Sequence, residues 1–243
     1  MRWLTFAQRC VKEILRDPIN LFFGLGFPLI LLFLMSAIQA NIPVSLFEIN
    51  KLTPGITVFG LSFLTLFSAT LVAKDRESAL LHRLYTTPLT GLDYILGYML
   101  PLLPIAAAQS LICYLAALPL GLQLSVNILY AVAGIIPMAI FNIAFGLLCG
   151  SILGAKQVGG ICGALFTNLS AWLSGIWFDL ELVGGTFRKI ANMLPFVHAV
   201  ELERALYQGN IESAAVHILP IMIYSIFVTA AAVFCFLHQK NNQ

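Results

Sequence analysis

The chain has 243 residues, of which 60% are hydrophobic and only 10% are charged, and its formal net charge is +2. Soluble domains carry roughly 25% charged and about 45–50% apolar residues, so this composition excludes an ordinary soluble enzyme. The small net charge, without a dense Lys/Arg cluster, excludes nucleic-acid binding. We therefore expect an all-α, polytopic membrane protein that forms one transmembrane domain over residues 1–243.

Residues 2–17 predict an amphipathic helix that ends before Pro18. A basic helix with aromatic anchors lies in the membrane interface, but a simple juxtamembrane anchor would have the same pattern. The residues alone favour neither interpretation. The apolar stripe holds Trp3, Phe6, Cys10, Val11 and Ile14, and the basic residues off that stripe are Arg2, Arg9, Lys12 and Arg16.

Six apolar segments are long enough to be transmembrane helices. No Lys, Arg, Asp or Glu lies inside them, which fits the cost of about 2.5–3.5 kcal/mol for a charge at the bilayer centre. The lack of an intramembrane carboxylate argues against a proton relay or an ion-coupled carrier. The segments are residues 21–38, 54–73, 94–120, 126–153, 158–178 and 215–237.

The loops between these spans differ in their content of Lys and Arg. One set of loops carries Arg2, Arg9, Lys12, Arg16, Lys74, Arg76, Arg83, Lys156 and Lys240. The other set carries Lys51, Arg188, Lys189 and Arg204. Because cytoplasmic loops hold the excess of basic residues, we expect the first set and both termini to face the cytoplasm.

Residues 74–83 form a charged island between the second and third spans, with five charged residues among ten. Drawn as a helix, the island has one apolar arc and one polar arc. An ordinary solvated loop is the alternative. The apolar arc holds Leu80, Leu81, Leu84 and Tyr85, and the polar arc holds Asp75, Ser78, His82 and Arg83.

Glu77 falls within the apolar arc of this helix. A buried carboxylate without a partner is costly, so two arrangements are open. Glu77 interacts with the helix dipole in the first turn, or it pairs with a basic residue of the N-terminal helix. Beyond the island, Thr90 and Asp93 predict a weak capping box that opens the third span.

Two further features concern packing. Gly146, Gly150 and Gly154 stand four apart, a spacing that lets membrane helices approach closely, and we interpret it as packing within one subunit rather than a dimer seam. The segment from Asp179 to Ser213 is too apolar for a plainly soluble loop. Two short helices that dip into the outer leaflet explain it, and an extracytoplasmic lid explains it equally well.

Recognisable catalytic motifs are absent from the sequence. It has no Gly-Lys dipeptide, and so no phosphate-binding P-loop, and no Gly-x-Ser-x-Gly motif. The four histidines are scattered, and the five cysteines show no paired spacing. We therefore expect no catalytic, cofactor-binding or metal-binding residues and no enzymatic activity in this chain.

Three motifs, in order along the chain, resemble the membrane subunit of bacterial ABC exporters of the ABC-2 type permease class, which includes drug, lipid and polysaccharide exporters. The first is the basic N-terminal helix, and the second is the Arg-Glu, Leu-Leu-x-Arg-Leu, Thr-Pro-Leu and Leu-Gly series within residues 74–97. The third is Asn192-Met193-Leu194-Pro195 followed by Ala199-Val200-Glu201 and Arg204-Ala205-Leu206. Two departures stand out: the family's Glu-x-Gly is Glu77-Ser78-Ala79 here, and Met193 replaces the proline of its Asn-Pro.

The resemblance implies a division of labour. A separate ATP-binding subunit hydrolyses ATP, while two copies of this chain, or this chain and a paralogue, form a pathway in the bacterial inner membrane for an amphiphilic drug, lipid or glycan. Residues 75–88 would be a cytoplasmic coupling helix beside a connecting N-terminal helix, and residues 179–210 would be re-entrant helices that close the outer side. The implied coupling residues are Asp75, Arg76, Glu77, Leu80, Leu81, His82, Arg83 and Leu84, and the implied outer-gate residues are Asn192, Pro195, Glu201 and Arg204.

Two other functional classes remain open from the residues alone. The chain could be a membrane scaffold or assembly factor without transport activity, or a carrier that works without an ATPase. A neighbouring reading frame with a P-loop ATPase would favour the exporter.

Overall fold

The computed structural model of the chain describes residues 2–78 and 90–241, and every regular element in these ranges is a helix. The predicted all-α class is thus confirmed for the described part of the chain. Long apolar sequences fold in this way because a helix satisfies its backbone hydrogen bonds internally, as a bilayer requires.

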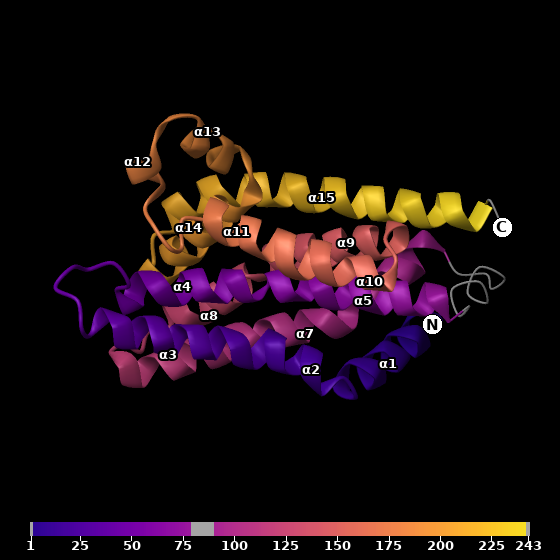
Figure 1. Cartoon of the computed structure of the whole chain (residues 1–243), viewed down its shortest axis with the longest axis horizontal. Coiled ribbons are helices and arrows are strands. Elements are labelled where there is room, and N and C mark those ends of the chain that lie inside the picture. Colours follow the sequence, from indigo (N-terminus) through magenta and orange to yellow (C-terminus); the bar gives the residue numbers. More distant parts are fainter. Residues whose placement is uncertain (1, 79–89, 242–243) are drawn as a thin grey trace.

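The helices form long passes between the two ends of an elongated bundle (Figure 1). The first half of the chain contains α1 (Arg2–Leu15), α2 (Pro18–Leu21), η1 (Phe22–Gly26), α3 (Phe27–Gln39), α4 (Ile49–Gly60), α5 (Ser62–Glu77), α7 (Gly91–Ala117) and η2 (Leu118–Leu120). The second half contains α8 (Asn127–Gly134), α9 (Ile136–Ile152), α10 (Ala155–Val158), η3 (Gly159–Phe166), α11 (Thr167–Leu173), α12 (Leu180–Val183), α13 (Gly185–Met193), α14 (Pro195–Gln208) and α15 (Ile211–Asn241).

Within the described ranges, five passes are long and apolar enough to cross a membrane. They overlap five of the six predicted spans. The passes are Pro18–Gln39, Ile49–Glu77, Gly91–Leu120, Asn127–Ile152 and Ile211–Lys240.

The remaining predicted span, residues 158–178, folds as the composite helix α10–η3–α11 and is not among the five. Its helical part begins at Ala155 and ends at Leu173, so it includes Lys156 and stops short of the predicted end. Gly175 then adopts a positive φ of 72°, a conformation that few other residues tolerate. The helix is consequently shorter and more polar than the apolar run suggests.

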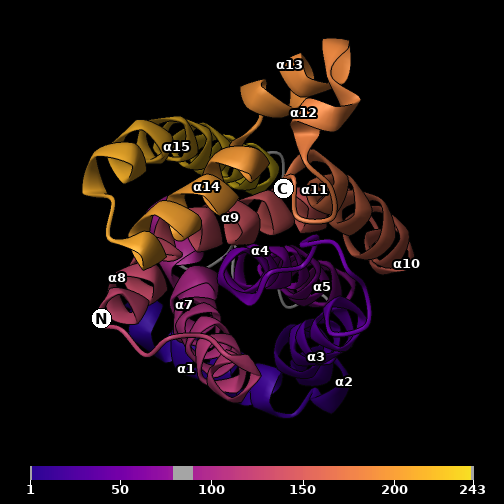
Figure 2. The ribbon, with the colours of Figure 1, turned by 90° about the vertical axis from the view of Figure 1, so that its left-hand side faces the viewer.

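The α4–α5 pass is the most deeply buried of the five and lies in the middle of the bundle (Figure 2). It packs closely against α9, because a Cβ at Gly150 would lie only 2.5 Å from the carbonyl oxygen of Ala69. The hydroxyl of Thr65 donates to the carbonyl oxygen of Asn142 across the same contact, at 2.9 Å. The interpretation of these glycines as packing residues within one subunit is therefore confirmed at Gly146 and Gly150, which both face α5.

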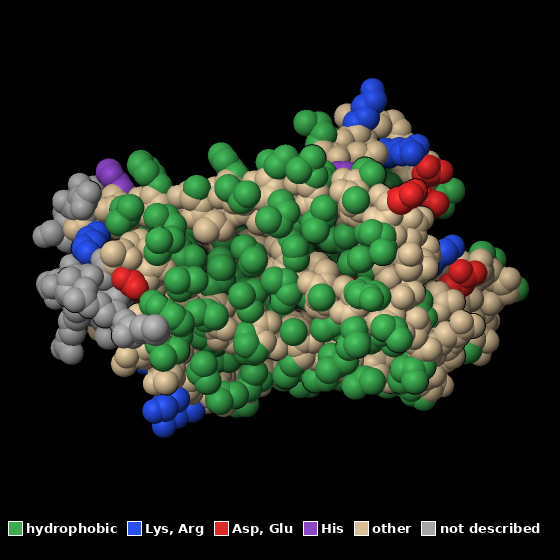
Figure 3. Space-filling view, turned by 180° about the vertical axis from the view of Figure 1, so that it is seen from behind, with side chains coloured by type: hydrophobic (Ala, Val, Ile, Leu, Met, Phe, Trp, Pro, Cys, Tyr) green, Lys and Arg blue, Asp and Glu red, His purple; other side chains and the backbone are tan. Residues whose placement is uncertain are grey.

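On the face of the bundle shown in Figure 3, hydrophobic side chains cover the middle and charged side chains lie at the two ends. The α1 helix, the last turn of α5, α10 and the end of α15 belong to one end, and the start of α4 and helices α12–α14 belong to the other (Figure 1). The two sets of described loop cations thus lie at opposite ends of a multi-pass membrane protein.

Candidate functional site

The last turn of α5 contains the first four residues of the charged island, Lys74 to Glu77. Asp75 continues the buried face of Leu71 and Val72, since residues three and four apart share one side of a helix. It is only 2% exposed, whereas Glu77 is exposed. The prediction that Asp75 lies on a polar outer arc and Glu77 on the apolar arc is wrong, because these residues extend the second span instead of starting a separate helix.

Asp75 binds two other helices at this end of the bundle. Arg9 of α1 donates Nη1 to Oδ2 at 2.7 Å and Nη2 to Oδ1 at 2.5 Å. The hydroxyl of Tyr98 of α7 donates to Oδ2 at 2.6 Å. A carboxylate in the last turn opposes the helix dipole, and this two-pronged bond to a guanidinium, one of the stronger protein hydrogen bonds, compensates for it. The three residues join α1, α5 and α7.

The surroundings of Arg9 keep it charged. It also contacts Glu13, one turn along α1, at 2.8 Å, and the hydrogen bond to Asp75 raises the pKa of Arg9 further above its usual value. Burial raises the pKa of the neighbouring Cys10 thiol to about 12, so this thiol is protonated and unreactive at neutral pH. The apolar stripe predicted for this helix is buried at Phe6, Cys10 and Ile14, whereas Val11 is exposed.

Arg76 and Glu77 bind the turn between α9 and α10. Arg76 donates to the carbonyl oxygens of Ser151 and, at 2.5 Å, of Leu153. These groups end α9 and lack partners within that helix. The carboxylate of Glu77 accepts from the backbone N–H of Ala155, the first residue of α10, at 2.9 Å. Glu77 therefore caps the start of a different helix, and the residue that pairs with the N-terminal helix is Asp75.

The other predicted coupling residues, Leu80, Leu81, His82, Arg83 and Leu84, lie outside the described residues. The chain is described again from Thr90, where the predicted capping box is present. The Thr90 backbone N–H donates to Asp93 Oδ2 at 3.0 Å, and the Asp93 N–H donates to Thr90 Oγ1 at 3.2 Å. The segment of residues 79–89 thus lies between a last turn of α5 bound to four helices and a capped first turn of α7.

The four predicted outer-gate residues lie at the opposite end of the bundle but do not converge on one site. Arg204 of α14 bonds to Glu201 at 2.7 Å and also donates to the carbonyl oxygen of Lys51, at 3.4 Å. Pro195 is the first residue of α14, and the carbonyl oxygen of Asn192 lies 3.0 Å from a ring nitrogen of His198, Nε2. These contacts hold the short helices together and onto α4.

A buried carboxyl group on α14 escaped the sequence-based prediction. Glu203 is 1% exposed and accepts from the hydroxyl of Tyr114 of α7 at 3.0 Å, while its Oε1 has no hydrogen-bond partner among the described residues. Burial raises the pKa of Glu203 well above its usual value. The available signal was its place on the same helical face as Val200 and Tyr207, which are both buried.

Other candidate chemistry is sparse in the described part of the chain. No group of three His, Cys, Asp or Glu side chains there could hold a metal ion, and all five cysteines are free thiols.

Comparison with known proteins gives one clear match. The model of the family described as ABC-2 type transporter matches residues 1–207 of the chain. No curated protein sequence matches it. The matched region contains the α1–α5–α7 junction, the α9–α10 turn and nearly all of α14.

Proposed function

Because this chain belongs to the ABC-2 type transporter family, we propose that it is the permease subunit of an ATP-driven exporter. Two copies, or this chain and a paralogue, form the pathway. A separate ATP-binding subunit binds and hydrolyses ATP. The end of the bundle with the larger number of cations faces the cytoplasm, in line with the positive-inside rule, and the cargo is an amphiphilic drug, lipid or glycan.

The observation that carries this proposal is the bonding around Asp75, Arg76 and Glu77. These consecutive residues connect α5 to α1 and α7, to the end of α9 and to the start of α10. A force applied to the segment that follows them reaches four helices through short polar contacts. This arrangement suits a segment that receives movement from a soluble partner, because rigid helices carry displacement between distant sites.

The proposed cycle uses these contacts in order. Residues 75–88 dock on the ATP-binding subunit, with Leu80, Leu81 and Leu84 seating the segment and His82 and Arg83 at the contact. Closure of the ATP-binding subunits on ATP displaces the end of α5, and α1 and α7 follow it through Arg9 and Tyr98. The membrane halves then open outward.

Two structural assignments belong to the same proposal. The α10–η3–α11 helix packs along α5 and acts as the sixth span. Helices α12, α13 and α14 are the re-entrant elements, with Asn192, Pro195, Glu201 and Arg204 holding the outer gate. Arg204 supports this role because it ties α14 to two other segments. It donates to the carbonyl oxygen of Lys51 in α4 and, at 3.5 Å, to that of Gly175 after α11.

The test is co-purification followed by reconstitution. The chain is expressed with a P-loop ATPase from a neighbouring reading frame, if one is found, and export of dye-labelled amphiphiles from proteoliposomes is measured with ATP, without ATP and with a hydrolysis-deficient ATPase. We expect a stable complex and export only with active ATPase. A chain that binds no ATPase would be a scaffold, and export driven by an ion gradient alone would identify a stand-alone carrier; either result would contradict the proposal.

Substitutions in residues 75–88 test whether this segment couples the chain to the ATP-binding subunit. Glu77→Ala or Arg83→Ala is expected to lower export and export-coupled ATP hydrolysis while membrane insertion persists. Unchanged export in both variants would refute the assignment of residues 75–88 as the coupling segment.

A further inference from the structure

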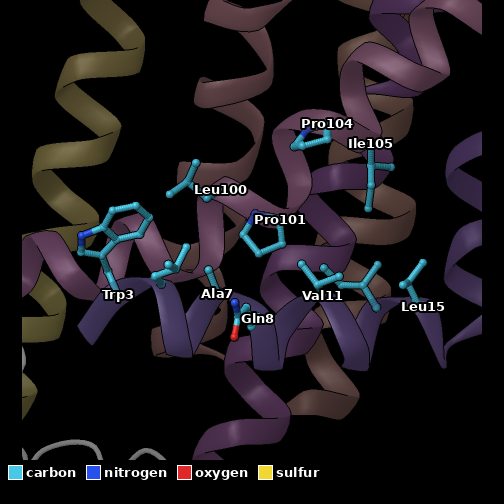
Figure 4. Close-up of a pocket in the computed structure, with 11 residues that line it drawn as sticks. Trp3, Ala7, Gln8, Val11, Leu15, Leu100, Pro101, Pro104 and Ile105 are labelled. Atoms are coloured by element: carbon cyan, nitrogen blue, oxygen red, sulfur yellow. The ribbon is translucent and has the colours of Figure 1, made fainter. Parts of the chain in front are cut away.

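An apolar groove runs between α1 and α7 (Figure 4). Its volume is about 410 Å³, and its walls are almost entirely apolar. Val11 of α1 points across it toward Pro101 of α7, Leu15 lies at one end on the side of Ile105, and Trp3 lies at the other end (Figure 4). Val11 and Leu15 are exposed in the described structure, so the groove opens on the outer surface of the bundle.

The groove lies beside a tight contact between α1 and α7 at Phe6. Phe6 packs against Gly97, where any Cβ would collide with its ring, and meets Tyr98 edge-on with ring centroids 4.8 Å apart. One turn later α7 contains Pro101 and Pro104, which lack N–H groups and disturb helix geometry. The tight contact and the prolines together leave an apolar space along α1.

A second hollow, of about 660 Å³, lies along the polar side of α1 and shares Gln8 with the groove. Four cations and two carboxylates line it. Two of these cations have partners, since Arg9 binds Asp75 and Lys74 lies 3.4 Å from Asp17. The other two, Lys12 and Arg16, are exposed and form no ion pair within the described part of the chain.

We propose that an anionic phospholipid binds along α1, with an acyl chain in the α1–α7 groove and its phosphate beside Lys12 and Arg16. The cations Lys12 and Arg16 lie in the hollow next to the apolar groove, just as the charged headgroup of a phospholipid lies next to its acyl chains. Trp3 beside the groove fits a helix at the membrane interface, where tryptophan is enriched. A bound lipid would hold α1 against α7 and so support the contact of Arg9 with Asp75.

The groove contains its own fluorescent reporter, Trp3. In the variant Trp172→Phe/Trp177→Phe, Trp3 is the remaining tryptophan of the chain. The full chain is placed in nanodiscs of phosphatidylcholine that contain either brominated phosphatidylglycerol or brominated phosphatidylcholine at equal mole fraction. Bromine quenches tryptophan on contact, so quenching of Trp3 measures occupancy of the groove. Native mass spectrometry of the unmodified chain counts bound lipids without any tryptophan change.

We expect brominated phosphatidylglycerol to be preferred by roughly five-fold for each free cation at low salt, and the preference to shrink as salt rises. Lys12→Gln/Arg16→Gln should abolish it, whereas Arg188→Gln/Lys189→Gln, at the other end of the bundle, should leave it intact. Val11→Phe fills the groove and should remove the bound lipid although both cations remain.

Three results would overturn the proposal. Equal quenching by the two lipids would show an ordinary annular contact. Lipid binding that survives Val11→Phe would mean that no acyl chain occupies the groove. Displacement by inorganic phosphate at millimolar concentration would show that the basic side binds free phosphate instead of a lipid headgroup.

Discussion

Arg9 and Asp75, which are 66 residues apart in the chain, form a two-pronged ion pair with N···O distances of 2.7 and 2.5 Å. The pair connects α1 to the last turn of α5. Tyr98 adds α7 through the same carboxylate. The geometry makes Asp75 the residue on which the arrangement of this end of the bundle depends.

Replacing Asp75 with Ala should destabilise the protein by about 1–3 kcal/mol, because the buried Tyr98 hydroxyl loses its acceptor. Arg9 adds less to this cost, since its side chain is 37% exposed and can turn to water. The measurement is thermal or denaturant unfolding of the purified protein in detergent. Asp75→Asn should cost less than Asp75→Ala, as its amide oxygen still accepts one hydrogen bond.

The matched control is Glu181→Ala at the opposite end of the bundle. Glu181 pairs with Arg188 at 2.8 Å, but its side chain is 67% exposed, and exposed pairs contribute little. The control should change stability by no more than about 0.5 kcal/mol. Equal losses in the two variants would show that burial of Asp75 contributes nothing.

A second prediction concerns Glu77, which caps α10 in the structure. Glu77→Ala removes the acceptor for the Ala155 N–H and should cost about 0.5–2 kcal/mol, as other lost N-caps do. Glu77→Gln keeps an oxygen acceptor. If Glu77 acts only as a cap, Gln should restore both stability and export-coupled ATP hydrolysis.

If Glu77 also contacts a cation of the ATP-binding subunit, stability and export-coupled ATP hydrolysis should respond differently to Glu77→Gln. Glu77→Gln would then restore the unfolding temperature but not the coupled hydrolysis. We expect this second outcome, because Glu77 is exposed at the edge of the proposed docking segment. Full restoration of coupled hydrolysis by Gln would contradict it.

A third prediction concerns the contact between α5 and α9. Gly146→Ala places a methyl group against Ser68 and the Thr65 carbonyl, and overpacking of this kind costs about 1–3 kcal/mol. Gly159→Ala is the control, since no atom lies within 4 Å of its Cβ position. Thermal unfolding should show a clear loss for the first variant and little change for the second. A tolerant Gly146 would mean that the two helices separate easily.

The features that sequence could predict were those set by local pattern. Five spans, the capping box of Thr90 and the buried face of α1 follow from the order of apolar and polar residues. The phase of the charged island does not follow from such a pattern. Asp75 lies on the buried face because α5 continues through it. Its burial is possible because Arg9 binds it, and Arg9 is too distant in the sequence to be found from neighbouring residues.

Glu203 illustrates the same limit. Its neighbours along α14 show that its face is buried, but a carboxyl group on a buried face is stable only if a distant group accommodates it. Tyr114, 89 residues away, provides that contact. The role of Glu77 as the cap of α10 was equally hidden, since its partner Ala155 lies 78 residues further along the chain.

The last prediction follows from the buried Glu203. Its pKa in the folded protein is well above its usual value because of burial, whereas in the unfolded chain it is about 4.3. Between these two values the folded state retains a proton that the unfolded state releases. The contribution of Glu203 to the free energy of unfolding is therefore largest below about pH 4.3. It falls as pH rises toward the folded pKa, by up to about 1.36 kcal/mol per pH unit.

Unfolding curves measured from pH 5 to pH 8 should show this decline in the unmodified protein. Glu203→Gln has no titrating proton at this position, so its free energy of unfolding should fall less steeply with pH, by the slope that corresponds to about one proton. Glu201→Gln is the control, since Glu201 lies on the same helix but is 40% exposed and paired with Arg204. The comparison reads only the difference in slope between the unmodified protein and each variant. Identical pH slopes for the unmodified protein and Glu203→Gln would show that Glu203 is ionised in the folded state.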